Sequence, residues 1–116
     1  MYLCIEGENR SMIVLMSDEL RALYETGKSR SYQAVERNQE LREGFARAVR
    51  IMTMAANINE VKAYSFLHYE QLKHEWSGYS SVRLSNRFVH RLIFKEIEDR
   101  LEIHIIDIDD THYGNK

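Results

Sequence analysis

The chain has 116 residues, of which 44% are hydrophobic and 29% charged, with one cysteine and no proline. This composition is typical of a soluble globular protein, and the length suits one small domain, since two cores would each be marginal. The single cysteine excludes an internal disulfide, and the apolar runs are too short to span a membrane. Acidic Glu6 and Glu8 stand where an export signal needs apolar residues. We therefore expect a cytoplasmic protein without membrane contact.

The net charge of −2 hides an uneven distribution along the chain. Residues 61–95 carry a formal charge of +4, whereas residues 96–116 carry −5. A basic zone followed by an acidic tail indicates contact with a polyanion on one face. A solvated strand face with mixed charges explains the same pattern equally well.

The first half of the sequence predicts a strand and two helices. The run MIVLM at 12–16 is short, apolar and β-branched, which favours a strand. Ser17 and Asp18 are N-cap candidates for a short helix that Gly27 is well placed to end. Apolar residues three or four apart then predict a longer amphipathic helix from Gln39 to Ala56.

After Asn57 the apolar period changes towards two, which is typical of strands. Three strands are predicted at 80–84, 88–97 and 101–108, with a weaker fourth at 68–74. Helices followed by a run of strands favour an α+β domain. We expect two N-terminal helices packed on one face of an antiparallel sheet of about four strands.

Strand alternation assigns the polar side chains to faces of this sheet. A three-residue loop at 85–87 would set Leu84 opposite Phe88, and a second such loop at 98–100 would set Asp107 opposite Arg91 and Ile105 opposite Ile93. His90 and His104 are expected on the helix-covered face. The face left open would carry these residues: Ser81, Arg83, Val89, Arg91, Ile93 and Lys95.

Such a face suits phosphodiester chemistry. Cleavage of RNA by its own 2′-hydroxyl needs a base for that proton, cations for the extra phosphate charge, and an acid for the departing 5′ oxygen. Arginine and lysine supply fixed positive charge, and histidine can act as acid or base near neutral pH. His68 and His74 lie six apart without flanking acids in a ligand pattern, so no metal and no cofactor are expected.

Several motifs, in this order and spacing, resemble the RelE/ParE toxin superfamily, and most closely its HigB-type branch of bacterial type II toxin–antitoxin systems. These are SDELRALYETGK (17–28), LHYEQLK (67–73), SVRL (81–84), HRLIFKEIED (90–99) and the closing IDIDDTHYGNK. The resemblance covers about residues 12–115, so that residues 1–11 form an N-terminal extension and residues 12–116 the toxin domain. It implies a compact RelE-like fold and ribosome-dependent endoribonuclease activity, without metal, that leaves a cyclic phosphate and a 5′-hydroxyl. The implied partners are mRNA on the ribosome and a cognate antitoxin, a small helix-turn-helix protein.

The resemblance also implies roles for particular residues. His68 and Lys73 in LHYEQLK are similar to a family element L-H-x-L-K, with two extra residues between them, and Arg91 in HRLIF matches a family strand. With His112 and Tyr113 of the closing motif, these form the implied catalytic set. The implied RNA-binding residues are Arg83, Arg87 and Lys95.

Each assignment has a purely structural alternative. Arg91 could form an ion pair with Asp107, His68 could cap a strand edge, and Lys73 could simply be exposed. The C-terminal cluster could be a frayed end. Trp76 is expected to be a packing residue, although stacking on a splayed base would use the same side chain.

Two other functions remain open. A ParE-like toxin would bind DNA gyrase instead of cutting RNA, and a degenerate toxin would act only as antitoxin partner and co-repressor. The lysine, arginine and histidine set favours the nuclease, because gyrase binding does not depend on it.

Overall fold

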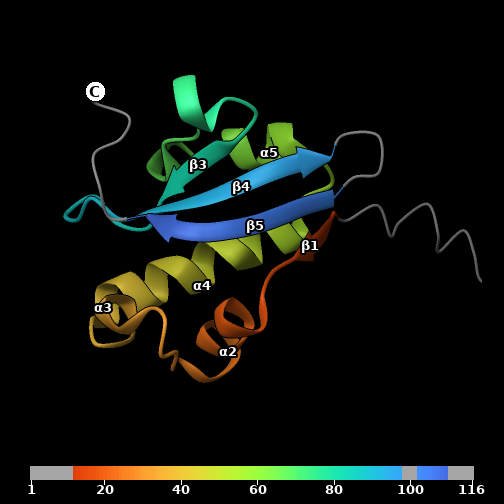
Figure 1. Cartoon of the computed structure of the whole chain (residues 1–116). Helices are drawn as coiled ribbons and strands as arrows, with labels where there is room; N and C mark the ends of the chain where they lie inside the picture. Colours follow the sequence, from red (N-terminus) through yellow and green to blue (C-terminus); the bar gives the residue numbers. More distant parts are fainter. Residues whose placement is uncertain (1–11, 98–101, 110–116) are drawn as a thin grey trace, which may run out of the picture.

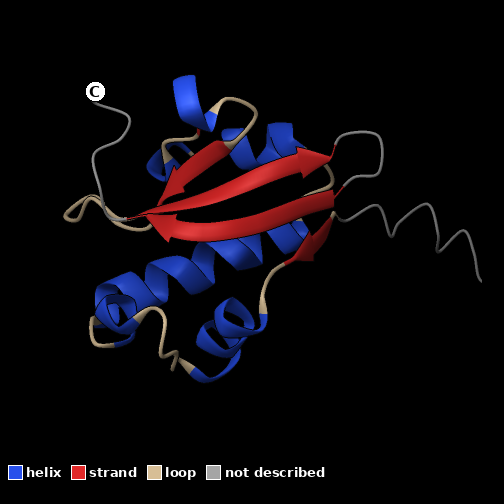
Figure 2. Ribbon diagram, in the orientation of Figure 1, coloured by secondary structure: helices blue, strands red, loops and turns tan. Residues whose placement is uncertain are grey.

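The computed structural model describes residues 12–97 and 102–109 and shows a five-stranded sheet with helices against it (Figures 1 and 2). The elements in chain order are β1 (Ile13–Leu15), α2 (Asp18–Thr26), α3 (Gln33–Glu36), α4 (Gln39–Met54), α5 (Ile58–Lys62), the 3-10 turn η1 (Ser65–Leu67), β2 (Glu70–Gln71), the 3-10 turn η2 (His74–Trp76), β3 (Ser80–Arg83), β4 (Arg91–Ile97) and β5 (Glu102–Asp109). No helix in the described ranges is both long and apolar enough to cross a membrane.

The two predicted helices form with the caps that their sequences indicate. The Ser17 hydroxyl accepts a hydrogen bond from the backbone N–H of Leu20 at 3.2 Å, and Gly27 ends α2 in the left-handed conformation with φ 80°. The Asn38 side chain caps α4 by accepting from Leu41 N–H at 3.1 Å. α4 ends at Met54, two residues before the predicted end.

The sheet differs from the predicted one in strand number and direction. Its order is β1-β5-β4-β3-β2, and β1 pairs with β5 in parallel, with Ile13 opposite Glu102 and Leu15 opposite His104. The sheet is therefore mixed and five-stranded, not antiparallel with about four strands. A parallel pair needs a long crossover connection, and here the whole helical layer lies between the two strands in sequence.

The turn between β3 and β4 is longer than the predicted three residues. Arg83 lies opposite Arg91 instead of Val89, and Leu84 N–H donates to the carbonyl of His90, so that Leu84 does not lie opposite Phe88 as predicted. The register moved by two residues, so the predicted faces of both strands are retained.

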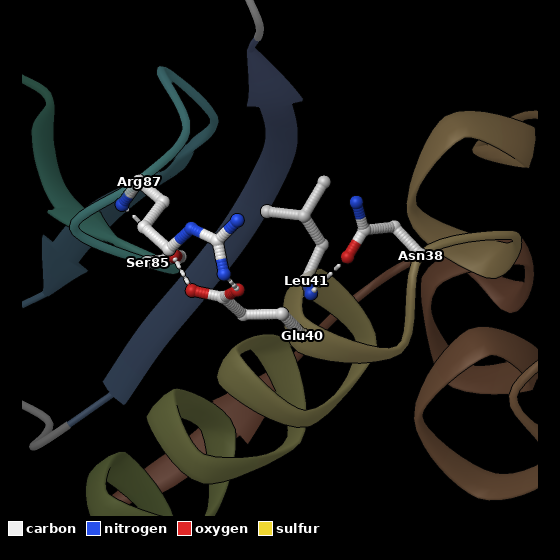
Figure 3. A network of polar contacts seen from close by, with 5 residues as sticks. All are labelled: Asn38, Glu40, Leu41, Ser85 and Arg87. Atoms are coloured by element: carbon white, nitrogen blue, oxygen red, sulfur yellow. Dashed lines mark hydrogen bonds and ion pairs between the residues drawn. The ribbon is translucent and has the colours of Figure 1, made fainter.

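Contacts to α4 hold this turn (Figure 3). The Ser85 hydroxyl donates to the Glu40 carboxylate, and Arg87 Nη1 lies 3.3 Å from the other oxygen of Glu40. A short-range sequence pattern does not show these long-range contacts, which is why the predicted turn was wrong.

The predicted register of β5 was also wrong, because Ile97 already pairs with Glu102, one residue beyond the predicted partner, and a bulge between Phe94 and Ile93 shifts the pairing by one more residue. Asp109 lies opposite Arg91, Asp107 opposite Ile93, and Ile105 opposite Phe94, with Ile106 as the extra residue. Ile105 therefore joins the helix-side core instead of facing Ile93. His104 lies opposite Lys95, on the open face and not on the helix-covered face as expected.

The bulge and one glycine allow close packing between the two layers. The bulge in β5 lets the apolar side chains of Ile103, Ile105 and Ile108 all reach the core. A Cβ at Gly44 would lie 1.9 Å from the carbonyl oxygen of Leu84, so the backbone of α4 touches the end of β3. The fully buried side chains of this layer include Leu20, Leu41, Phe45, Met52, Leu84, Leu92 and Phe94.

Candidate active site

The sheet face away from the α4 layer carries the predicted basic residues. In Figure 1, α4 and α5 pass behind the sheet, and β4 and β5 present their other side. Val82, Leu92 and Phe94 belong to the helix-side core. By strand alternation, Arg83, Arg91, Ile93 and Lys95 lie on the opposite face, as predicted.

Arg91 is fixed on this face by three acceptors. Its Nε donates to Ser81 Oγ at 2.8 Å, and its Nη2 donates to the carbonyl of His68 at 3.1 Å and to Glu70 Oε1 at 3.2 Å. The Arg91 side chain is 15% exposed. Nη1 donates to no acceptor in the described part of the chain, so the guanidinium keeps an edge for a ligand.

Arg83 lies directly opposite Arg91 and places a second cation there. Like charges in this cross-strand position repel one another. Arg91 is partly compensated by Glu70, but no carboxylate in residues 12–97 and 102–109 forms an ion pair with Arg83. The two arginines therefore place neighbouring positive charges on the open face, and Asp109 of β5 lies opposite Arg91 on its other side.

Sequence reasoning missed Glu70, and it placed Ser81 on the open face without giving it a role. Ser81 is fully buried, and its hydroxyl orients the guanidinium of Arg91. The Glu70 side chain is 50% exposed, so its carboxylate contacts both Arg91 and solvent. Alternation along LHYEQLK could have indicated Glu70, since it lies two positions after His68.

His68 contributes its backbone to the site. It adopts a left-handed conformation with φ 50° at the end of η1, a conformation that is uncommon outside glycine. Its carbonyl accepts from Arg91, while its side chain is exposed. The strand-edge alternative for His68 and a role in proton transfer are both compatible with this placement.

Lys73 and Lys95 lie at the other end of the same ladder. Leu72 N–H donates to the Tyr79 carbonyl, so Leu72 lies beside Tyr79. Ser80, the residue after Tyr79, pairs with Phe94, the residue before Lys95. Lys73 therefore lies near Lys95 along the strand direction. Arg91 and Lys95 are four residues apart on β4, a separation of about 13 Å. The structure thus groups Arg91 with Arg83 and Glu70, and separates Lys73 from them.

The remaining predicted residues lie elsewhere. The Arg87 side chain is 77% exposed in the β3–β4 turn, where it pairs with Glu40 (Figure 3). His112 and Tyr113 lie outside the described residues.

The alternative ion pair of Arg91 with Asp107 is not formed, because Arg91 pairs with Glu70. Asp107 accepts a hydrogen bond from the Tyr32 hydroxyl at 2.7 Å. Burial and this hydrogen bond raise the pKa of Tyr32 far above its ordinary value.

The architecture is that of a RelE-like α+β fold, and solved structures support this likeness. No protein-family model and no curated protein matches the sequence. The structure is similar to a YoeB/ParE toxin from Agrobacterium tumefaciens, with a TM-score of 0.53 and 17% identity over 87% of this chain and 100% of that one. It is also similar to a chain of a YoeB-YefM complex from Staphylococcus aureus, with a TM-score of 0.52 and 18% identity over 88% of this chain and 98% of that one.

This chain therefore has the fold of the YoeB/ParE toxins, as the resemblance to the RelE/ParE superfamily implied. At these identities the likeness concerns the fold. The similar structures are those of YoeB or YoeB/ParE proteins, so the HigB branch stays a prediction from sequence.

Proposed function

We propose that this chain is the toxin of a type II toxin–antitoxin system and an endoribonuclease that cuts mRNA on the ribosome without a metal ion. The observation that carries the proposal is the cluster on the open face. There, a guanidinium fixed by Ser81, His68 and Glu70 lies opposite the second guanidinium of Arg83. Preorganised cations of this kind stabilise the charge that develops on a phosphate during cleavage.

The reaction follows from the functional groups available. Glu70 accepts the proton of the 2′-hydroxyl, and the 2′ oxygen attacks the adjacent phosphorus. The bond from phosphorus to the 5′ oxygen breaks, which leaves a 2′,3′-cyclic phosphate and a 5′-hydroxyl. Arg91 holds the non-bridging oxygens, and an acid from the predicted set of His68, His112 and Tyr113 protonates the 5′ oxygen.

The remaining cations hold the RNA strand on either side. Arg83 contacts the backbone beside the scissile phosphate, and Lys95 contacts it towards the other end of the ladder, whereas alternation from Glu70 turns Lys73 to the opposite side of the sheet edge. Arg87 supplies charge at the turn. The similar YoeB chain from Staphylococcus aureus occurs in a toxin-antitoxin complex with YefM, which supports an antitoxin as the second partner of this chain.

Substitution of Arg91 tests the proposal. Inducible expression is followed by mapping of 5′ ends on translated mRNA, and we expect codon-phased cuts with the wild type. Arg91→Ala should lower the cleavage rate at least about 100-fold, because it removes the fixed cation at the reacting phosphate. Arg50→Ala, an exposed arginine on α4 in the opposite layer, should leave cutting unchanged.

Other outcomes identify the competing functions. Growth arrest with uncut mRNA and DNA damage signalling would assign the chain to gyrase inhibition. The absence of any arrest would indicate a degenerate toxin that acts only as antitoxin partner. Circular dichroism of each variant separates loss of activity from loss of the fold.

A further inference from the structure

A group of two aromatic rings and one cation lies at the Lys95 end of the sheet. The rings of Trp76 and Tyr79 meet edge to face, with centroids 5.6 Å apart and an interplanar angle of 85°. Lys95 Nζ lies 6.0 Å from the centroid of the Tyr79 ring. We call these three residues the Trp76 cluster.

The backbone fixes the cluster firmly. Tyr79 N–H donates to the carbonyl of Trp76 at 3.0 Å, and the Tyr79 carbonyl accepts from Leu72 N–H at 2.9 Å. Gly78 between the two rings has φ 94°, which a residue with a side chain rarely adopts. Glycine therefore permits the tight turn that brings the rings together.

The cluster shares the open face with Arg91. Ser80 hydrogen-bonds Glu96 and pairs with Phe94, on the core side, so that the preceding Tyr79 points to the other side. Lys95 reaches Tyr79 from this same open face. The cluster is about 13 Å from Arg91 along β4, which is more than one nucleotide along an extended strand.

A comparable group of two aromatic rings and one cation lies on the other side of the molecule from Arg91. Tyr64 and Phe66 also meet edge to face, with centroids 5.7 Å apart, and Arg47 lies 5.2 Å from the Phe66 ring. These rings are 43% and 41% exposed. Arg47 belongs to α4, in the layer behind the sheet, so this group is turned away from Arg91. It is a matched control of the same chemistry.

We propose that the Trp76 cluster is a base-stacking subsite for the RNA strand bound at Arg91. An unpaired nucleotide beyond the scissile phosphate stacks on the aromatic rings, and Lys95 binds its phosphate. This inference rests on the proposed function, because it names a further contact of the same substrate. It also gives Trp76 a role besides packing.

Trp76 is the only tryptophan of the chain and reports directly on the subsite. The wild-type protein is titrated with a short single-stranded oligonucleotide of 2′-deoxy sugars, which cannot undergo 2′-hydroxyl attack. Binding is followed by the anisotropy of an end label, and stacking by quenching of tryptophan emission. We expect quenching by the base-bearing oligonucleotide and none by an abasic one of the same length.

Variants separate the subsite from its matched control. Tyr79→Leu should weaken binding about tenfold, as expected for the loss of one stacked base. Lys95→Gln should weaken binding and reduce its salt dependence. Phe66→Leu should leave affinity unchanged, and circular dichroism checks that each variant is folded.

The outcomes distinguish this inference from the proposed reaction. Emission that stays unchanged overturns the subsite, whether the oligonucleotide binds elsewhere or does not bind. Equal loss of affinity in Tyr79→Leu and Phe66→Leu overturns it as well. A protein that shows quenching but cuts no mRNA keeps the subsite and loses the reaction, whereas codon-phased cutting with unchanged emission does the reverse.

Discussion

The two faces of β3 and β4 are made from alternate residues of the same strands but have different chemistry. On the helix-covered face, Val82, Leu92 and Phe94 are fully buried among apolar side chains. On the open face, Ser81 and its partner Ile93 are equally buried, yet the neighbouring Arg91 keeps a polar edge. Burial on one face stabilises the fold, and burial on the other orients a charge.

This difference means that stability and chemistry can be changed separately. A residue on the covered face contributes packing, and its replacement should lower the free energy of unfolding. A residue on the open face contributes charge or a proton acceptor, and its replacement should lower activity while the fold stays intact. Three substitutions, from the largest expected effect to the smallest, test this division.

Gly44→Ala should disrupt the packing between α4 and the covered face of the sheet. The added Cβ would lie 1.9 Å from the Leu84 carbonyl oxygen and 2.8 Å from its carbon, so α4 and β3 must move apart. Because both atoms are backbone, no side chain can turn away to relieve the clash. We expect the free energy of unfolding to fall by about 3 kcal/mol or more, measured by urea denaturation.

The same substitution at Gly78 provides the control. Its φ of 94° strains any residue with a side chain, but no atom lies within 4 Å of an added Cβ. Gly78→Ala should therefore cost only about 1–2 kcal/mol, from backbone strain alone. Equal losses in the two variants would contradict the close contact between α4 and β3.

Glu70→Gln should remove the proposed proton acceptor from the open face without affecting the fold. The amide oxygen can still accept from Arg91 Nη2, so the guanidinium keeps its position, but the group no longer accepts a proton. We expect cleavage to slow by about 100-fold or more, with unfolding unchanged. Single-turnover cleavage of ribosome-bound mRNA and urea denaturation give the two measurements.

A pH–rate profile distinguishes a base from a positioning residue. A proton acceptor at Glu70 makes the pH–rate profile of Glu70→Gln differ in shape from that of the wild type, whereas a residue that only positions Arg91 leaves the shape unchanged. Glu43→Gln on α4, which removes a carboxylate that accepts a hydrogen bond from the exposed Gln39, should retain the wild-type profile. A Glu70→Gln enzyme with wild-type rate at every pH would remove Glu70 from the mechanism.

The sequence predicted the faces of the sheet better than its registers. Apolar and polar residues alternate through β3 and β4. Alternation assigns Arg83, Arg91 and Lys95 to one side, and a turn that is longer by two residues leaves this assignment unchanged. The pairing of β1 with β5 and the bulge at Ile106 depend on contacts between distant segments. Local patterns do not contain that information.

The site was predictable in part for the same reason. Arg91 could be selected from its strand position and motif, but Ser81 and Glu70 are its partners only because β2, β3 and β4 lie side by side. Lys73 follows His68 closely in sequence, yet the extended strand β2 lies between them and places them at opposite ends of its pairing with β3. The roles of His68, Lys73, His112 and Tyr113 stay predictions.

Tyr69→Phe should have the smallest effect, because it changes a polar network at the end of the covered face. The Tyr69 hydroxyl donates to Glu96, which also accepts from Ser80 at 3.0 Å. Loss of this hydrogen bond should lower the free energy of unfolding by about 1 kcal/mol at neutral pH, with cleavage unchanged. Urea denaturation and 5′-end mapping give the two values.

The pH dependence of this difference tests its cause. Burial, followed by the hydrogen bond to Glu96, raises the pKa of Tyr69 from 10.0 to about 12. The folded protein therefore holds this proton more tightly than the unfolded chain, so the stabilisation is fully present below pH 10 and is lost as pH rises through about 12. The stability gap between wild type and Tyr69→Phe should shrink over that interval. Tyr32, whose pKa is also raised, titrates in both proteins and cancels in the difference. A stability difference that stays constant from pH 9 to 12 would show that the Tyr69 hydroxyl contributes packing alone. The covered face would then be stabilised by apolar packing over its whole length.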